Sequence, residues 1–146
     1  MEIIYLDTNV VLDFLDENRI GSETANKVLE IIYKNHYTVA ISEDMLSTIY
    51  YISKDKSRTL EFFDFIIRSE WLIISFGTQT IQDSIKFSKE RGLDFEDILQ
   101  CLTAKREKVK YLITNDRKFV DCGVSTLTAN DFIEKFRIKS SKENFD

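Results

Sequence analysis

Five short apolar runs divide the chain, and longer stretches with helical spacing separate them. The runs are rich in β-branched and aromatic residues and lie at 2–6 (EIIYL), 38–41 (TVAI), 71–75 (WLIIS), 110–113 (KYLI) and 124–127 (VSTL). Runs of this length and composition predict β-strands. Elsewhere the apolar positions recur every three or four residues, which predicts helices over 9–16, 22–36, 43–54, 57–69, 78–91, 95–108 and 129–136.

The alternation of strands with helices indicates the fold class. Parallel neighbouring strands need crossover connections, and helices in those connections cover both faces of the sheet. We therefore expect an α/β protein with three layers, α/β/α, around a central parallel sheet of five strands. No repeat or internal linker interrupts the pattern, so residues 1–146 are expected to form one domain. Its polar, lysine-rich end, about 137–146, is a candidate for fraying.

Composition narrows the class of protein. An apolar content of 43% and an aromatic content of 12% exclude a disordered chain. No apolar run approaches the ~20 residues that cross a bilayer, and the start lacks a secretory pattern, so the sequence predicts a cytoplasmic protein without membrane contact. A net charge of −5 means that any contact with nucleic acid would use a local basic patch. Cys101 and Cys122 have no metal-binding spacing, and we expect both to be reduced and buried in part or whole.

Several common catalytic systems are disfavoured by the residues present. His36 is the sole histidine, and its place at a predicted helix end is more typical of a charge partner for the helix terminus. Serine–histidine and cysteine–histidine nucleophiles are therefore disfavoured. Neither G-x-x-x-x-G-K-[ST] nor G-x-G-x-x-G occurs, so a phosphate-cradling loop has no support. The remaining candidate chemistry rests on carboxylates.

Acidic residues follow two of the predicted strands and open one helix. Asp7 ends the first strand, and Asp116 follows the fourth strand in the sequence ITND. Sites in parallel sheets form beyond the carboxyl ends of strands where the strand order reverses, so the two carboxylates converge if strands one and four are neighbours. Asp94 and Asp97 open the helix that leads into strand four. Clustered carboxylates repel one another unless a cation compensates, and this donor set predicts Mg²⁺ or Mn²⁺.

Each of these acids also has a purely structural interpretation. Asp7 is suited to cap the helix that follows it, and Asp116 is suited to begin a turn. Asp94 and Asp97 have the spacing of a capping box. The two roles can be divided within that pair, with Asp94 as the cap and Asp97 as the metal ligand.

Two stretches, YLDTNVVLDFL and DFEDILQCLTAKREKVKYLITNDRKF, resemble in order and spacing two signatures of the PIN domain. This is the nuclease fold of the small VapC toxins of toxin–antitoxin pairs. GVSTLTANDFI is similar to the family's last strand and helix, so the resemblance covers essentially the whole chain. Carried over by position, the resemblance implies that Asp7, Asp97 and Asp116 form an acidic metal-binding cluster. It also implies an outer contact from Asp94 and two supporting polar groups, Asn9 and Thr114.

The sequence departs from the family pattern in the helix after the second strand. SEDMLSTIYYIS places Thr48 where the family has a further acid. The hydroxyl of Thr48 is a supporting group that can hold water but supplies no negative charge. Asp44 lies four residues earlier on the same helical face and is a better substitute than Glu43. If neither serves, the site has three carboxylates and weaker metal binding.

The resemblance implies a ribonuclease that uses Mg²⁺ or Mn²⁺ to hydrolyse phosphodiester bonds in RNA. It also implies the role of toxin, a cognate antitoxin as partner and a homodimer whose surface the aromatic residues around 50–65 would supply. Five basic side chains are candidates to steer the RNA backbone: Lys105, Arg106, Lys108, Arg117 and Lys118. The basic run at 105–110 is also typical of a solvated helix end.

Two other functions stay open. Without an acid at Thr48, the fold would serve as an inactive module that binds RNA or a protein. A phosphatase with an aspartyl nucleophile at Asp7 is the second alternative. Its usual second aspartate, two residues on, is replaced by Asn9, which counts against it.

Overall fold

The five strands form one parallel sheet in a computed structural model that describes the backbone of residues 1–145 and the side chains of 1–137. The strand order is β3-β2-β1-β4-β5, and every neighbouring pair is parallel. The strands are β1 (Ile3–Leu6), β2 (Thr38–Ser42), β3 (Leu72–Ile74), β4 (Tyr111–Ile113) and β5 (Thr126–Leu127). The predicted five-stranded parallel sheet is therefore confirmed, and β1 lies between β2 and β4 as the site prediction requires.

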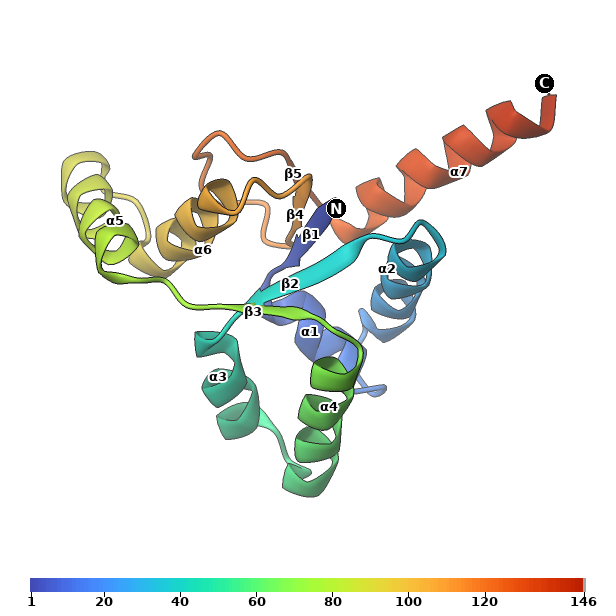
Figure 1. The fold of residues 1–146 in the computed structure, drawn as a ribbon, viewed down its shortest axis with the longest axis horizontal. Helices are drawn as coiled ribbons and strands as arrows, with labels where there is room; N and C mark the ends of the chain where they lie inside the picture. Colours follow the sequence, from blue (N-terminus) through green and yellow to red (C-terminus); the bar gives the residue numbers. More distant parts are fainter. Residues whose placement is uncertain (146) are drawn as a thin grey trace.

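Helices cover both faces of this sheet. In Figure 1, α5 and α6 lie on one side of the strands, and α1, α3 and α4 lie on the other. The helices are α1 (Thr8–Leu15), α2 (Ser22–Lys34), α3 (Asp44–Ile52), α4 (Lys56–Arg68), α5 (Thr78–Arg91), α6 (Phe95–Arg106) and α7 (Ala129–Phe145). The three-layer α/β/α arrangement is the fold class that the sequence predicts.

Element boundaries differ from the predicted ones at helix ends. α2 stops at Lys34 because His36 takes a left-handed backbone conformation (φ 58°), which ends the helix. α7 continues past the predicted end at 136, through Phe145. The predicted fraying concerns 137–146, where Asp146 and the side chains after Arg137 lie outside the described residues. Among the described residues, no helix combines the length and the apolar character needed to cross a bilayer.

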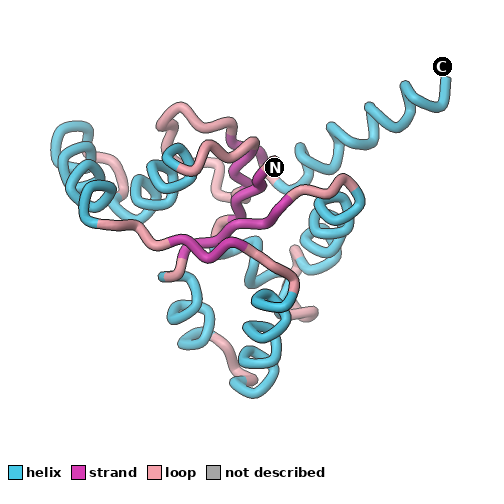
Figure 2. Tube along the Cα trace, in the orientation of Figure 1, coloured by secondary structure: helices cyan, strands magenta, loops and turns pink. Residues whose placement is uncertain are grey.

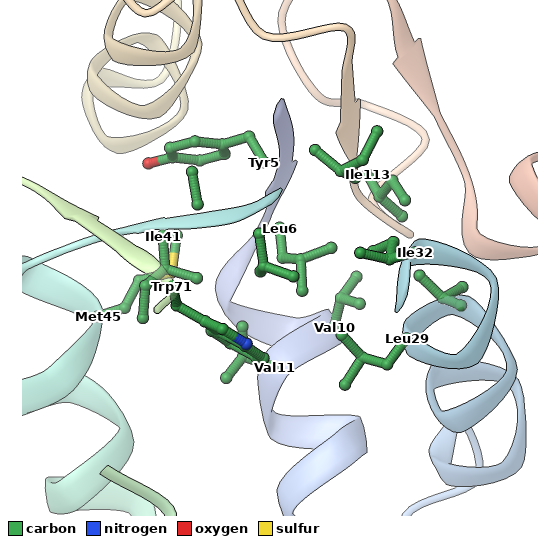
Figure 3. Packing of buried hydrophobic residues seen from close by; sticks show 14 of the residues in the cluster. Tyr5, Leu6, Val10, Val11, Leu29, Ile32, Ile41, Met45, Trp71 and Ile113 are labelled. Atoms are coloured by element: carbon green, nitrogen blue, oxygen red, sulfur yellow. The ribbon is translucent and has the colours of Figure 1, made fainter. Parts of the chain in front are cut away.

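The central strand β1 is buried along its whole length, from Ile3 to Leu6. A strand that is covered on both faces reads as a continuous apolar run, which is why EIIYL carries no alternation. Figure 3 shows Leu6, Val10, Ile32 and Ile113 packed around its end. Asp7 is the first polar residue beyond this apolar run, and its backbone N–H donates to the carbonyl of Ile113 at 2.9 Å. The sheet itself therefore fixes the backbone of Asp7.

A disulfide bond joins Cys101 in α6 to Cys122 in the loop between β4 and β5. The prediction of two reduced cysteines is wrong, although Cys101 is fully buried and Cys122 partly buried as expected. The loop runs alongside α6 (Figure 2), where Val120 packs with Ile98 and Cys101 in a small apolar cluster of its own. This long-range contact brings the Cα atoms of the two cysteines to 6.1 Å, within the range of a disulfide.

We expect reduction of this disulfide to lower the free energy of unfolding by about 3 kcal/mol, because the bond restricts the unfolded chain over a loop of moderate length. Urea unfolding followed by circular dichroism, with and without a phosphine reductant, measures the difference. The double variant Cys101→Ala/Cys122→Ala is the control and should not respond to reductant. An unchanged midpoint for the wild type would show that the two cysteines are not bonded in solution.

Candidate active site

Asp7 is both a helix cap and a member of an acidic cluster. Its Oδ1 accepts from the backbone N–H of Thr8 at 2.8 Å, so the side chain caps α1. Its Oδ2 accepts from the Thr114 hydroxyl at 2.8 Å, across from β1 to the end of β4. The structural and functional interpretations of this aspartate therefore do not compete, because each oxygen has its own partner.

Thr114 links the two aspartates that follow β1 and β4. Its side chain is buried, and its hydroxyl donates to Asp7 while it accepts from the backbone N–H of Asp116 at 3.1 Å. The Asp116 carboxylate accepts from the N–H of Lys118 at 2.9 Å, so Asp116 also shapes a turn, as the structural interpretation predicts. The supporting role expected for Thr114 thus has a geometric basis.

The start of α6 adds further carboxylates at the same edge. Asp94 is the N-cap, and its Oδ1 accepts from the N–H of Asp97 at 3.0 Å, which confirms the predicted cap. The pKa of Asp97 is raised to about 6, mainly by burial and then by the charges of Asp94, Asp116 and Asp7. The three acids that the sequence predicts thus lie at one edge of the sheet, and the charges of Asp7 and Asp116 disfavour the charged form of Asp97.

The pKa of Asp7 is raised as well. Burial is the main cause, the hydrogen bonds from Thr114 and Thr8 oppose it, and the charge of Asp116 adds to it. The charged neighbours that shift the pKa values of Asp7 and Asp97 are carboxylates in every case. A bound cation would stabilise the charged forms of carboxylates whose pKa values are raised in this way.

Glu96 belongs to this cluster, and the sequence analysis missed it. Burial raises its pKa, and the charges of Asp44, Asp7 and Asp94 raise it further. The available signal was its place beside Asp97 in the first turn of a helix that begins at the site, but its neighbours had already been assigned to a capping box. Glu96 also connects the cluster to Asp44, at the start of α3.

The three residues weighed for the family's remaining acid take different places. The charge of Asp44 raises the pKa of both Glu96 and Tyr5. Glu43 precedes α3, and its backbone N–H donates to the carbonyl of Ile74 at 2.8 Å. The Thr48 hydroxyl donates to the carbonyl of Asp44 at 3.4 Å, within its own helix. Of the two acids, Asp44 is the one whose charge reaches Glu96.

Two of the basic residues predicted to steer RNA, Arg106 and Lys105, extend toward other parts of the chain. Arg106 donates to the carbonyls of Ser75 and Phe76 and to the hydroxyl of Thr80, so its guanidinium ties α6 to the segment after β3. Lys105 extends toward Gly123, where an added Cβ would lie 3.5 Å from its Nζ. The guanidinium of Arg106 is therefore held by the segment after β3, and the Lys105 side chain lies near Gly123.

The other predicted polar and basic residues lie at the start of α1, after α6 and directly after Asp116. Asn9 is exposed in the first turn of α1, beside Asp7, and Lys108 lies in the turn after α6 with φ 55°. Arg117 and Lys118 follow Asp116 and are exposed. Arg117 and Asp116 line an open pocket of about 650 Å³ between the β4–β5 loop and the start of α7. Of the predicted basic residues, Arg117 and Lys118 therefore lie beside the acids in sequence and space.

A model of the PIN domain family matches residues 4–124, which is most of the chain. The chain belongs to the PIN domain family. Ribonuclease VapC1 from Aquifex aeolicus (strain VF5) is 30% identical over 139 residues, which cover 92% of this chain and 96% of that protein. The resemblance read from the two sequence signatures is thereby confirmed.

Solved structures similar to this PIN domain include VapBC2 from Rickettsia felis bound to a DNA fragment from their promoter. That match has a TM-score of 0.66 and 25% identity, and it covers 86% of this chain and 98% of the other. A toxin–antitoxin complex from Klebsiella pneumoniae matches with a TM-score of 0.65 and 22% identity, over 86% and 97% of the two chains. The second likeness shows the fold.

The carboxylates of this PIN domain are spread rather than gathered into a cage. Within the described residues, no three His, Cys, Asp or Glu side chains stand close enough to enclose one metal ion. Yet the charge of Asp116 reaches both Asp7 and Asp97, and the charge of Asp7 reaches Asp97, because each raises the pKa of the acid it acts on. An ion held by one or two carboxylates and several waters fits this arrangement, and that is how Mg²⁺ is commonly held.

We expect the metal-free protein to lose stability as the pH rises from about 4 to 6. Because the pKa of Asp97 is about 6 in the folded protein and lies at its ordinary value of 3.8 in the unfolded chain, the folded state binds more protons in this window. Urea unfolding in chelator-treated buffer across this pH range measures the slope, and Asp97→Asn should make the fall shallower. Asp64→Asn, at an exposed position on α4, should keep the wild-type slope. An Asp97→Asn variant with an unchanged slope would contradict the prediction.

Proposed function

We propose that this PIN domain is a metal-dependent endoribonuclease and the toxin of a toxin–antitoxin pair. The observation that carries the proposal is that Thr114 links Asp7, at the end of β1, to Asp116, after β4, and that both acids raise the pKa of Asp97 on α6. Membership of the PIN domain family and the 30% identical relative named a ribonuclease support the choice of reaction. We assign Asp7, Asp97 and Asp116 as the metal-binding and catalytic acids.

The proposed cofactor is Mg²⁺ or Mn²⁺. The residues fit such an ion because their side chains present carboxylate oxygens and carry repelling charges that a cation would offset. Asp7 and Asp97 are the first candidates to hold it, with Asp116, Glu96 and Asp44 around them. A divalent ion in this place, when bound, lowers the pKa of water and offsets the charge of a phosphate.

The chain's own groups would position both the acids and the substrate. Thr114 and the N–H of Thr8 hold the two oxygens of Asp7, so this carboxylate has one orientation. α1 and α6 both begin at the cluster, with Asp7 and Asp94 as their caps. Helix N-termini carry partial positive charge, which offsets part of the acidic charge and favours an approaching phosphate. Arg117 and Lys118 would steer the RNA backbone toward Asp116.

A binding module without catalysis is the second candidate function, and Thr48 is the observation that favours it. The Thr48 hydroxyl donates to its own helix backbone and brings no charge to the cluster. Such a module would bind RNA or a protein through the same edge of the sheet. It has no need to order Mn²⁺, so a metal titration separates the two functions.

We also propose an antitoxin partner and a homodimer of a single-domain chain, 1–146. The antitoxin proposal rests on the 25% identical VapBC2 structure. The dimer proposal rests on apolar side chains that α3 and α4 leave exposed: Tyr51, Ile52, Leu60 and Ile67. Exposed apolar side chains gathered on neighbouring helices are typical of interaction surfaces. All five strands belong to one sheet, which supports a single domain.

We expect wild-type protein to cleave a mixed pool of labelled RNAs with Mg²⁺ or Mn²⁺ and to stop cleaving with EDTA. Asp7→Asn and Asp97→Asn should each slow cleavage by at least about a hundredfold, the scale for losing one group that stabilises transition-state charge. Asp64→Asn is the matched control on α4 and should cleave at the wild-type rate. A folded Asp97→Asn variant with full activity would remove Asp97 from the mechanism. A wild type that neither cleaves nor binds Mn²⁺ would favour the binding module.

The neighbouring acids Glu43 and Asp44 give a second test. Asp44→Asn should weaken Mn²⁺ affinity about tenfold, the low end for losing a group near a metal, because its charge reaches Glu96. Glu43→Gln removes the same charge one residue earlier and should leave the affinity unchanged. Titration of Mn²⁺ followed by electron paramagnetic resonance measures both. Equal losses in the two variants would mean that only the total charge of this region matters.

A further inference from the structure

Three buried polar side chains meet beneath the acidic cluster. The Tyr5 hydroxyl donates to Oε1 of Gln100, and Nε2 of Gln100 donates to the Ser42 hydroxyl at 3.3 Å. Their exposed fractions are 0%, 2% and 0% for Tyr5, Gln100 and Ser42. Figure 3 shows the oxygen of Tyr5 pointing away from the apolar side chains around Leu6 and Val10. Burying three polar groups costs free energy unless all are paired, so this chain of hydrogen bonds needs a reason.

Each member of this chain lies close in sequence to an acid of the cluster. Tyr5 is two residues before Asp7 on β1, and Ser42 ends β2 directly before the segment that carries Asp44. Gln100 is three residues after Asp97 on α6, a spacing that places both on one helix face. The hydrogen bonds therefore join β1, β2 and α6 close in the chain to Asp7, Asp44 and Asp97.

Gln100 is the polar contact between the first half of α6 and the sheet. Ile98 in this half and Cys101 just after it belong to the small cluster with Val120 rather than to the main core. Ala104, farther along the helix, is in the main core. Apolar contact is tolerant of small shifts, whereas a side-chain amide with two directed partners permits one position. The helix end that carries Asp97 is thus placed on the sheet by Gln100.

We propose that Gln100 is a positioning residue: its hydrogen bonds to Tyr5 and Ser42 set how far Asp97 lies from Asp7 and Asp44. The carboxylates repel one another, so α6 needs a contact that resists displacement from β1. Gln100 supplies it without touching substrate or metal. The proposal rests on the proposed function in so far as the spacing it sets serves metal binding.

The test compares three full-length variants. Gln100→Leu removes both hydrogen bonds at similar volume, and Tyr5→Phe removes one of them and keeps the ring. Thr103→Val is the matched control, because Thr103 lies on the same helix and buries a hydroxyl that has no hydrogen-bond partner in the described part of the chain. The readouts are Mn²⁺ affinity by electron paramagnetic resonance and amide hydrogen exchange along α6 in metal-free protein.

We expect Gln100→Leu and Tyr5→Phe to weaken Mn²⁺ binding about tenfold, as loss of a partner that orients ligands commonly does. Amide exchange should quicken from Asp97 to Gln100 and stay unchanged at Lys105 and Arg106. Thr103→Val should match the wild type in both readouts. Wild-type Mn²⁺ affinity and wild-type exchange in folded Gln100→Leu or Tyr5→Phe would overturn the proposal. If the wild type itself does not bind Mn²⁺, the proposed function fails, and the exchange pattern alone still decides whether Gln100 positions α6.

Discussion

Repulsion among carboxylates at one edge of the sheet is the unfavourable interaction that the rest of the structure has to offset. Asp7, Asp97 and Glu96 all have raised pKa values, and nearby acids contribute to each shift. A group of like charges this close is unfavourable in a metal-free protein. It persists because the backbone beneath it is fixed by a fully buried central strand and its parallel neighbours. The favourable free energy of packing in the core therefore offsets the charge repulsion at the site.

The cluster also shows how one residue type serves two needs. Aspartate is a good helix cap because its carboxylate accepts from backbone N–H groups, and helix N-termini favour negative charge. Asp7 and Asp94 both use this property. Two helices therefore begin where the acids gather, and the partial positive charge of their first turns reduces the cost of holding the acids there.

Much of this arrangement could be predicted from the sequence because it depends on local pattern. Continuous apolar runs marked the buried strands, and the position of Asp7 and Asp116 at strand ends placed them at the same edge once strands one and four were neighbours. The Asp94 cap followed from its spacing to Asp97.

The features that were not predicted from the sequence depend on contacts between distant segments, which leave no periodic signal in the sequence. The disulfide requires the β4–β5 loop to fold back on α6. Arg106 looked like a solvated cation, yet it contacts the segment after β3. Glu96 was hidden by neighbours with a sufficient local explanation, and Gln100 lay within an otherwise ordinary helix.

The order in which the elements leave the ribosome gives the Thr114–Asp7 hydrogen bond a further meaning. Its two residues are 107 positions apart in the chain, at the ends of neighbouring strands. During synthesis Asp7 has no neighbour from β4 until β4 has left the ribosome and paired with β1. The carboxylates of the two strands are together only in a nearly finished chain, so this edge of the sheet assembles late in synthesis.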